Sequence, residues 1–276
     1  MRATVPALRN AWLAGAVALA LAACQTPMAN IGVSVDPETA SEANIESLSA
    51  VIAREPNSPE AYNVRGSAYG RAGRYDDAIA DFNRAIEIDP NFARAYANRA
   101  LIHRRNGDTN AAFEDYNRAI RADQRYAPAY VGRGNIYRQE GKLDLALADY
   151  NAAVQLDPTD AQAFHNRGLA YQAQGQHQTA IEDFTSAIGL SPGAGEPYDG
   201  RGLSYLALGD ARTALDDFNE AVKRDRQSFR AWTNQGLALE QLGEAKKAFA
   251  AFARAASLNQ NYQPAKDGMR RTQGAA

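Results

Sequence analysis

Few side chains in this sequence have the type and spacing that covalent chemistry or metal binding requires. Its 276 residues include one cysteine, Cys24, and three histidines far apart along the chain, His103, His165 and His177. A nucleophile needs a neighbouring base and an orienting group, and a zinc site needs closely spaced Cys or His ligands. No such arrangement recurs here, and no glycine-rich loop suits a phosphate. We therefore predict no catalytic residue, no metal site and no cofactor, so the chain is not expected to be an enzyme.

Charged residues of one kind do recur at a fixed spacing. An Arg is followed sixteen residues later by an Asp five times along the chain: Arg65 and Asp81, Arg99 and Asp115, Arg133 and Asp149, Arg167 and Asp183, Arg201 and Asp217. Gln235 and Ala251 stand where a sixth pair would fall, so both members are lost together. A single buried charge costs several kcal/mol, whereas replacing a whole pair costs little. We predict five structural ion pairs, with a basic ladder for an acidic ligand as the alternative.

The overall charge balance argues against nucleic acid as a partner. The chain is 45% hydrophobic and 22% charged, which suits a folded protein of this length. Its formal net charge is −2, and Lys and Arg are spread without blocks. Binding to nucleic acid needs a basic patch or stripe. No such stripe is present in the sequence.

The residues before Cys24 have the pattern of an export signal. Arg2 and Arg9 precede an apolar run from Ala11 to Ala23, which at about 1.5 Å per residue is too short for a hydrocarbon core of roughly 30 Å. Leu21-Ala22-Ala23-Cys24 resembles the lipobox of bacterial lipoproteins. That resemblance implies cleavage before Cys24 and acylation of Cys24, and more than one acyl chain gives a stable anchor. The alternatives are an ordinary signal peptide with a coincidental cysteine, or a buried apolar helix.

A unit of 34 residues repeats six times from Pro59 to Tyr262. Position four is aromatic, position eight is small, positions twenty and twenty-seven are Ala, and position twenty-four is aromatic. A glycine occupies position fifteen in every copy: Gly73, Gly107, Gly141, Gly175, Gly209 and Gly243. Between them, apolar residues recur at three- and four-residue steps, which predicts helices with one buried face. Glycine can take the positive φ that ends a helix. Each unit is therefore predicted to be a helical hairpin.

This pattern resembles the tetratricopeptide repeat (TPR), over about three-quarters of the chain. We predict an all-α fold, an α-α superhelix of six helix-pair repeats with capping helices, because hairpins of this kind bury their apolar faces only by stacking. The predicted boundaries are a leader at 1–23, a lipidated Cys24 with a flexible tether at 24–38, a capping helix at 39–58, repeats at 59–92, 93–126, 127–160, 161–194, 195–228 and 229–262, and a C-terminal cap at 263–276.

The resemblance also implies where partners bind. In TPR proteins, positions two, five, six, nine, twelve and thirteen of the first helix line the concave face. Here these positions include the candidate partner-binding residues Asn63, Arg94, Asn98, Asn135, Arg138, His165, Asn166, Asp199 and Asn234. Amides can donate to and accept from the backbone of an extended peptide. The alternative for each residue is an ordinary solvated position.

Together these features predict a scaffold that binds other proteins. The repeat style also resembles the NlpI-type lipoproteins, adaptors for peptidoglycan hydrolases, which implies cell-envelope proteins as partners and a bacterial outer membrane location facing the periplasm. Gln25 after the cysteine favours outer-membrane sorting by the same resemblance. The alternatives are a pilotin-type lipoprotein of secretin or pilus assembly, and a subunit that binds a small ligand such as a muropeptide. Homodimerisation through the terminal repeats stays open.

Overall fold

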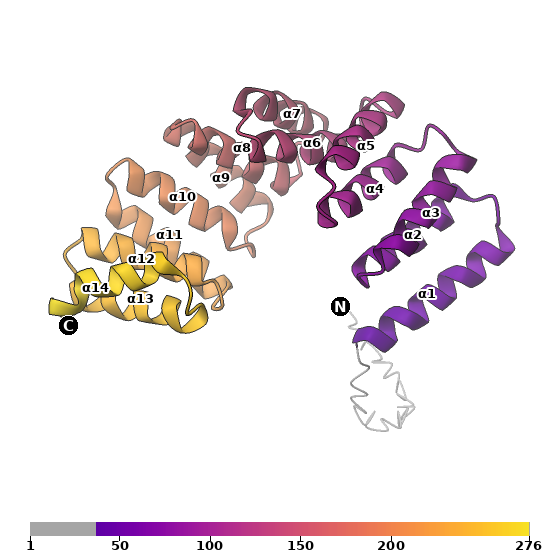
Figure 1. The fold of residues 1–276 in the computed structure, drawn as a ribbon. Helices are drawn as coiled ribbons and strands as arrows, with labels where there is room; N and C mark the ends of the chain where they lie inside the picture. Colours follow the sequence, from indigo (N-terminus) through magenta and orange to yellow (C-terminus); the bar gives the residue numbers. More distant parts are fainter. Residues whose placement is uncertain (1–36, 276) are drawn as a thin grey trace, which may run out of the picture. The chain divides into compact units, whose positions relative to one another are not determined.

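The computed structural model describes residues 37–275, which form fourteen α-helices and a final 3₁₀ turn (Figure 1). Helix α1 spans Pro37–Arg54. Six helix pairs follow: α2 (Pro59–Arg71) and α3 (Tyr75–Ile88), α4 (Ala93–Arg105) and α5 (Thr109–Ala122), α6 (Ala127–Gln139) and α7 (Leu143–Leu156), α8 (Ala161–Ala173) and α9 (His177–Leu190), α10 (Glu196–Ala207) and α11 (Ala211–Arg224), α12 (Phe229–Gln241) and α13 (Ala245–Leu258). Helix α14 spans Gln263–Thr272 and leads into the turn Gln273–Ala275.

The all-α repeat architecture is confirmed, and one helix begins earlier than expected. Helix α1 starts at Pro37, two residues before the predicted start at residue 39 and inside the predicted tether. Proline is favoured at the first position of a helix, because the N–H that it lacks would have no partner there. The predicted leader, Cys24 and the rest of the tether lie outside the described residues.

Each helix pair reverses direction at the glycine of position fifteen. All six of these glycines have positive φ, between 73° and 86°, and no other described residue does. Their amide nitrogens bond back to carbonyls of the helix that has just ended, as in Gly107 to Arg104 at 3.1 Å. A side chain at this φ would be strained. The glycine spacing therefore marks the six turns.

The core of each pair is one aromatic ring pressed against bare helix backbone. The rings of position twenty-four are at most 4% exposed: Phe82, Tyr116, Tyr150, Phe184, Phe218 and Phe252. A Cβ placed on Gly202 would lie 2.7 Å from the ring of Phe218 in the same repeat. A Cβ on Gly200, at position six of the fifth repeat, would lie 2.7 Å from Phe184 of the fourth. A Cβ on Gly168 of the fourth repeat would lie 3.0 Å from the same Phe184 ring, so glycine lets this ring touch the first helices of two successive repeats.

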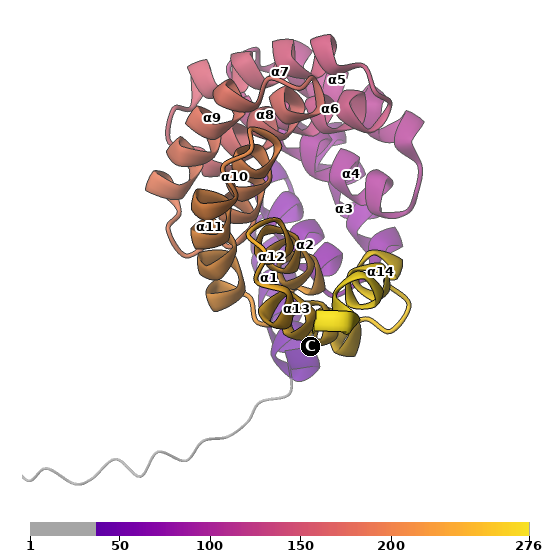
Figure 2. The same ribbon diagram turned by 90° about the vertical axis from the view of Figure 1, so that its left-hand side faces the viewer.

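The first helices of the pairs lie closer together than the second helices. Helices α2, α4, α6, α8, α10, α12 and α14 each contact the next in that series, whereas among the described helices no second helix contacts the second helix of a neighbouring pair. Closer spacing on one side curves the stack toward that side. Figures 1 and 2 show α1 to α14 following this curved path. The first helices therefore line the concave face of the described array.

The structure brings together all five of the Arg and Asp residues that recur sixteen apart. In each pair the guanidinium donates two hydrogen bonds to the carboxylate, from Nε and Nη2, at 2.7 to 2.9 Å. The Asp side chains are 5 to 8% exposed and the Arg side chains 12 to 21%. Each guanidinium carbon also lies 5.5 to 5.9 Å from the centroid of the position-four ring. These are structural ion pairs within each repeat.

The same arginines also connect each repeat to the one before it. Arg133 Nη1 donates to Asn117 Oδ1 at 2.7 Å, and Arg201 Nη1 to Thr185 Oγ1 at 3.0 Å. Equivalent bonds run from Arg65 to Ser49 of α1, from Arg99 to Asn83 and from Arg167 to Asn151. The acceptors all stand at position twenty-five of the preceding unit, a recurrence that the sequence analysis did not use. Each guanidinium therefore spans three helices.

The sixth repeat keeps the contact between repeats and lacks the charges. Gln235 Nε2 donates to Asn219 Oδ1 at 2.7 Å, in the place of the arginine. Ala251 is 4% exposed where an Asp stands in the other repeats. Gln235 and Ala251 border a pocket of about 570 Å³ whose lining includes Trp232, Leu239 and Arg254.

We predict that methyl groups on two helical glycines have opposite effects on stability. Gly202→Ala should lower the melting temperature, because its Cβ meets the Phe218 ring and overpacking costs about 1–3 kcal/mol. Gly189→Ala should raise it, because nothing lies within 4 Å of that Cβ and alanine favours a helix by roughly 0.5–1 kcal/mol. Thermal unfolding followed by circular dichroism measures both, and equal shifts would contradict the close approach at Gly202.

We also predict that Arg133 and Asp149 are energetically coupled. Arg133→Gln alone leaves a carboxylate that is 7% exposed without its cation, which should cost about 3–5 kcal/mol. Arg133→Gln with Asp149→Ala copies the sixth repeat and should cost clearly less than the sum of the single changes. Urea unfolding of the four proteins gives the coupling energy. The matched control is the ion pair of Arg84 and Glu87, whose side chains are 46% and 64% exposed and which should show almost no coupling energy. A coupling energy near zero for Arg133 and Asp149 would refute the pairing.

Candidate partner-binding groove

The concave face carries three pockets between successive first helices. Two lie in the first half of the array, with volumes of about 180 and 410 Å³, and share Asn98, Leu101 and Arg105. The third, of about 420 Å³, lies in the second half and includes residues of α8, α10 and α12. Most of the lining residues come from positions two, five, six, nine, twelve and thirteen of the repeats, and the others include aromatic residues of positions twenty-four and thirty-four. We call this row of pockets the groove.

The first half of the groove combines cations with aromatic and amide groups. The larger pocket there is bordered by Arg104 and Arg105 from the last turn of α4, and by the rings of Tyr116 and Tyr126. Asn135 lies on its wall and accepts a hydrogen bond from the Tyr150 hydroxyl at 2.8 Å. Burial raises the pKa of both the Tyr116 and the Tyr150 hydroxyl, so both stay neutral at physiological pH.

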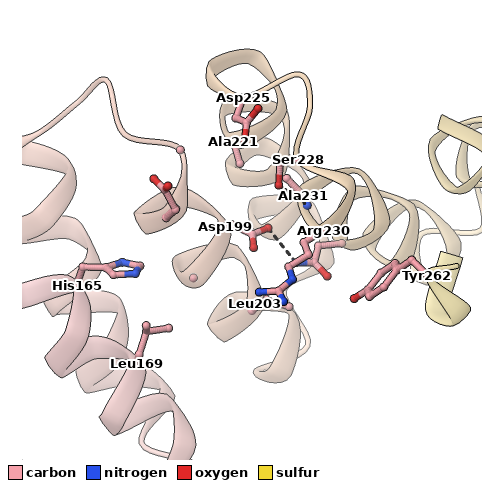
Figure 3. A pocket seen from close by; sticks show the side chains of 14 residues that line it. His165, Leu169, Asp199, Leu203, Ala221, Asp225, Ser228, Arg230, Ala231 and Tyr262 are labelled. Carbon is pink, nitrogen blue, oxygen red and sulfur yellow. Dashed lines mark hydrogen bonds between the residues drawn. The ribbon is translucent and has the colours of Figure 1, made fainter. Parts of the chain in front are cut away.

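The second half of the groove is built from four helices whose polar side chains point into one space. Figure 3 shows His165 of α8, Asp199 of α10, Arg230 of α12 and Tyr262 at the start of α14 around this pocket. Asp199 Oδ1 accepts a hydrogen bond from Asn234 Nδ2 at 2.9 Å. Both signs of charge thus face one cavity, with Leu169 and Leu203 on its apolar wall.

Burial shifts the pKa values of two side chains of this pocket, Asp199 and His165, in the directions that favour their neutral forms. It raises the pKa of the Asp199 carboxyl, although the hydrogen bond from Asn234 opposes the shift. It lowers the pKa of the His165 imidazole, which the charge of Arg138 lowers further and that of Glu196 raises. Loss of water around a side chain disfavours its charged form. His165 is therefore a neutral side chain at physiological pH.

Three polar atoms at the middle of the groove are buried without a hydrogen-bond partner among the described residues. They are Arg138 Nε, His165 Nδ1 and Asn166 Nδ2. In the first and fifth repeats, position five offers an acceptor to the Asn at position six of the next repeat, as when Asn63 Oδ1 accepts from Asn98 Nδ2 at 2.8 Å. The third repeat has Val131 at that position, so Asn166 has no such acceptor. Buried polar groups normally have partners, which makes this part of the groove suited to a ligand.

The nine candidate residues do not all face a ligand. Five of them line the pockets: Asn98, Asn135, His165, Asp199 and Asn234. Asn63 is 3% exposed, because its amide is turned toward Asn98, so it joins two repeats and does not offer a contact surface. Arg94 is exposed but is paired with Glu60 at 2.8 Å. Arg138 and Asn166 supply the unpartnered atoms just described, although Asn166 is only 7% exposed.

Several residues that line the groove were not among the predicted binding residues. Arg71, Arg104 and Arg105 occupy positions twelve and thirteen, which were already assigned to the concave face, and only their charge would have singled them out. Leu101, Leu169 and Leu203 share position nine, which was also assigned to the concave face, but the predicted set held polar and charged side chains only. Tyr262 is the last residue of the sixth repeat and reaches back to the pocket of α12. It shares position thirty-four with Tyr126, which borders the pocket of the first half, so a repeat alignment shows this set as well.

Neither a metal cluster nor a membrane span is found in the described part of the chain. No three His, Cys, Asp or Glu side chains within residues 37–275 are grouped so that they could hold a metal ion. No helix in that range is both long enough and apolar enough to cross a bilayer.

Solved structures of other proteins share this fold at low sequence identity. A chain of the APC/C hetero-tetramer Cut9-Hcn1 matches with a TM-score of 0.75 and 19% identity, over 86% of this chain and 46% of that one, so this chain spans less than half of its length. PilF of Pseudomonas aeruginosa matches with a TM-score of 0.70 and 19% sequence identity, and the match covers 81% of this chain and 100% of PilF. PilW, described as a type IV pilus biogenesis factor, matches with a TM-score of 0.68 and 18% sequence identity, and the match covers 76% of this chain and 97% of PilW.

Models of the repeat family match most of the helical array. Models described as tetratricopeptide repeat match residues 59–92, 82–114, 161–193 and 200–264, and a model described as TPR repeat matches residues 134–175. No curated protein matches the sequence. The matched ranges include the helix pairs whose glycine turns, buried rings and concave first helices are described above. The chain belongs to the tetratricopeptide-repeat proteins.

Proposed function

We propose that this protein is an adaptor that holds extended segments of partner proteins in its concave groove. The observation that carries the proposal is the group of buried, unpartnered polar atoms of Arg138, His165 and Asn166 at the middle of that groove. Such atoms gain a partner when a peptide backbone brings carbonyl and amide groups to them. The pockets on either side extend the surface over repeats one to six. The proposal is for binding and not for catalysis.

We further propose that the adaptor is a lipoprotein of the bacterial outer membrane, facing the periplasm. Support comes from the segment Leu21-Ala22-Ala23-Cys24 and the short apolar run before it. Acyl chains on Cys24 would supply the membrane attachment. In that location the partners are other envelope proteins, and the resemblance to NlpI-type lipoproteins makes peptidoglycan hydrolases the first class to test.

A second candidate function is assembly of a pilus. Its support is that this chain matches nearly the whole of the PilF and PilW chains, 100% and 97% of them, whereas it matches 46% of the longer APC/C chain. The same groove would then hold a component of the pilus machinery. A small ligand such as a muropeptide would instead fit a single pocket of about 420 Å³, and a thermal-shift panel separates it from peptides, because only bound molecules raise the melting temperature.

We predict that partner proteins crosslink to the concave face and not to the second helices. A photoreactive amino acid at Leu101 or Leu203, both half-buried in the groove, should trap protein partners in living cells. The same group at Leu145, which is 49% exposed on α7, is the matched control and should trap few. Crosslinked bands are identified by mass spectrometry. Equal yields from all three sites would contradict binding in the groove.

We predict that Cys24→Ser releases the protein from the membrane. The hydroxyl of serine is not a substrate for the thiol acylation that the lipobox resemblance implies. Cell fractionation with immunoblotting should find the wild-type protein in the outer-membrane fraction and the variant in soluble fractions. Thermal unfolding is the control and should be unchanged, since the substitution lies before the helical array. A variant that still sediments with membranes would overturn the lipid anchor.

A further inference from the structure

At the ends of the first helices, cations are confined to one half of the groove. At positions twelve and thirteen of the first helices, repeats one to three have Arg71, Arg104, Arg105 and Arg138, whereas repeats four to six have Gln172, Ala173, Leu206, Ala207, Glu240 and Gln241. The four arginines belong to α2, α4 and α6, three neighbouring helices that contact one another in series (Figure 1). The repeats are otherwise alike, so helix packing does not require this difference.

None of these four arginines has a carboxylate partner among the described residues, a property that Arg121, Arg125, Arg226, Arg230 and Arg254 of the repeats share. The four differ from those five in lying together at the ends of three consecutive first helices. The ion pairs of the described residues, found within 4.0 Å, include none of the four. Arg105 Nη1 reaches only the carbonyl of Gly70, at 3.4 Å. Asp160 is the one acidic residue that lines the adjoining pocket, and its carboxylate already accepts a hydrogen bond from the backbone N–H of Gln162 at the start of α8. The positive charge of this half is therefore not neutralised from within.

Two of the four arginines, Arg104 and Arg138, act on the same buried hydroxyl group. The charges of Arg104 and Arg138 both act on the Tyr150 hydroxyl, and that of Arg138 also acts on His165. The Tyr150 hydroxyl donates to Asn135, so it offers these arginines no negative charge. Arg138 Nε and Asn166 Nδ2 remain buried donors without acceptors. Anions are the groups that satisfy several such donors at once.

We propose that repeats one to three hold an acidic, extended segment of a partner protein, with carboxylates spaced about three residues apart. Neighbouring packed helices lie roughly 8–10 Å apart. A polyproline II chain has three residues per turn and rises about 3.1 Å per residue, so side chains three apart lie on one face at about 9 Å. Such a segment presents one carboxylate to each of α2, α4 and α6. This inference rests on the adaptor function and names the chemistry of its partner.

The second half of the groove sets the limit of this acidic segment. The next pocket is lined by three acidic residues, Glu196, Asp199 and Asp225, and by a single arginine, Arg230. A carboxylate moving from α6 toward α10 would leave a basic wall and meet acidic side chains. Like charges at close range disfavour binding. The segment is therefore expected to have its acidic residues at one end and neutral or basic residues at the other.

Fluorescence anisotropy with the full-length protein and short labelled peptides tests this. The probes are a proline-rich peptide with glutamate at every third position, the same peptide with lysine in place of glutamate, and one with the glutamates placed consecutively. The spaced acidic peptide should bind most tightly, and binding should weaken as salt is raised, because salt screens charge pairs. Equal binding of the lysine peptide would overturn the proposal, and equal binding of the consecutive peptide would overturn the three-residue spacing.

Matched variants connect the binding to the arginines. Arg104→Gln with Arg138→Gln should weaken binding by on the order of tenfold or more, since each removes hydrogen bonds to a charged group. Arg104→Lys with Arg138→Lys should recover part of it, which a folding defect would not allow. Arg121→Gln with Arg125→Gln removes the same charge from exposed positions of the second repeat and should change affinity less than about twofold. Unchanged affinity in the first variant would overturn the proposal.

Two outcomes separate this inference from the adaptor function. If Leu101 and Leu203 crosslink to proteins but the acidic peptide does not bind, the acidic partner is wrong and the adaptor stands. If neither crosslinks nor peptide binding occur, both fail. Inorganic polyphosphate is added as a competitor, and if it binds more tightly than the spaced peptide at equal charge, the site takes a phosphate ligand and the protein segment is overturned.

Discussion

The contact between an aromatic ring and bare helix backbone is the constraint on which the other features of this array depend. Phe184 rests on Gly168 of its own repeat and on Gly200 of the next. A methyl group at either glycine would meet the ring within 3.0 Å. Because the ring touches two successive first helices, those helices are drawn together while the second helices spread apart. Curvature, and with it a concave face, follows from this one packing arrangement.

Charge then fixes the relation between neighbouring repeats. A guanidinium such as that of Arg133 binds Asp149 of its own repeat and Asn117 of the one before, and its planar fork allows both at once. With these arginines committed to structure, the cluster of arginines left to bind a partner in the groove is the one at the ends of α2, α4 and α6. The two sets differ in position within the repeat, not in residue type, which is why the same fold can use arginine both to hold itself together and to attract a ligand.

Much of this fold could be predicted from periodicity, because each repeat solves the same packing problem. The positive φ of Gly73 and the burial of Phe82 follow from positions fifteen and twenty-four alone. The groove was less predictable, because its surface depends on what the neighbouring repeat supplies. Asn63 and Asn166 both carry amides on the first helix, yet one is satisfied by Asn98 and the other faces Val131 without an acceptor. Which side chains remain free is a property of pairs of repeats.

The missing charges of the sixth repeat have a mechanical consequence. Neighbouring repeats touch only each other, so tension along the array passes through its joints in series. The joint between repeats five and six keeps the hydrogen bond that the other joints have, because Gln235 donates to Asn219 in place of the arginine. The mechanical difference therefore lies between the two helices of the sixth repeat, which lack the Arg–Asp ion pair of the other repeats, and not in the joint before it. The hollow beside Trp232 lies at this same place.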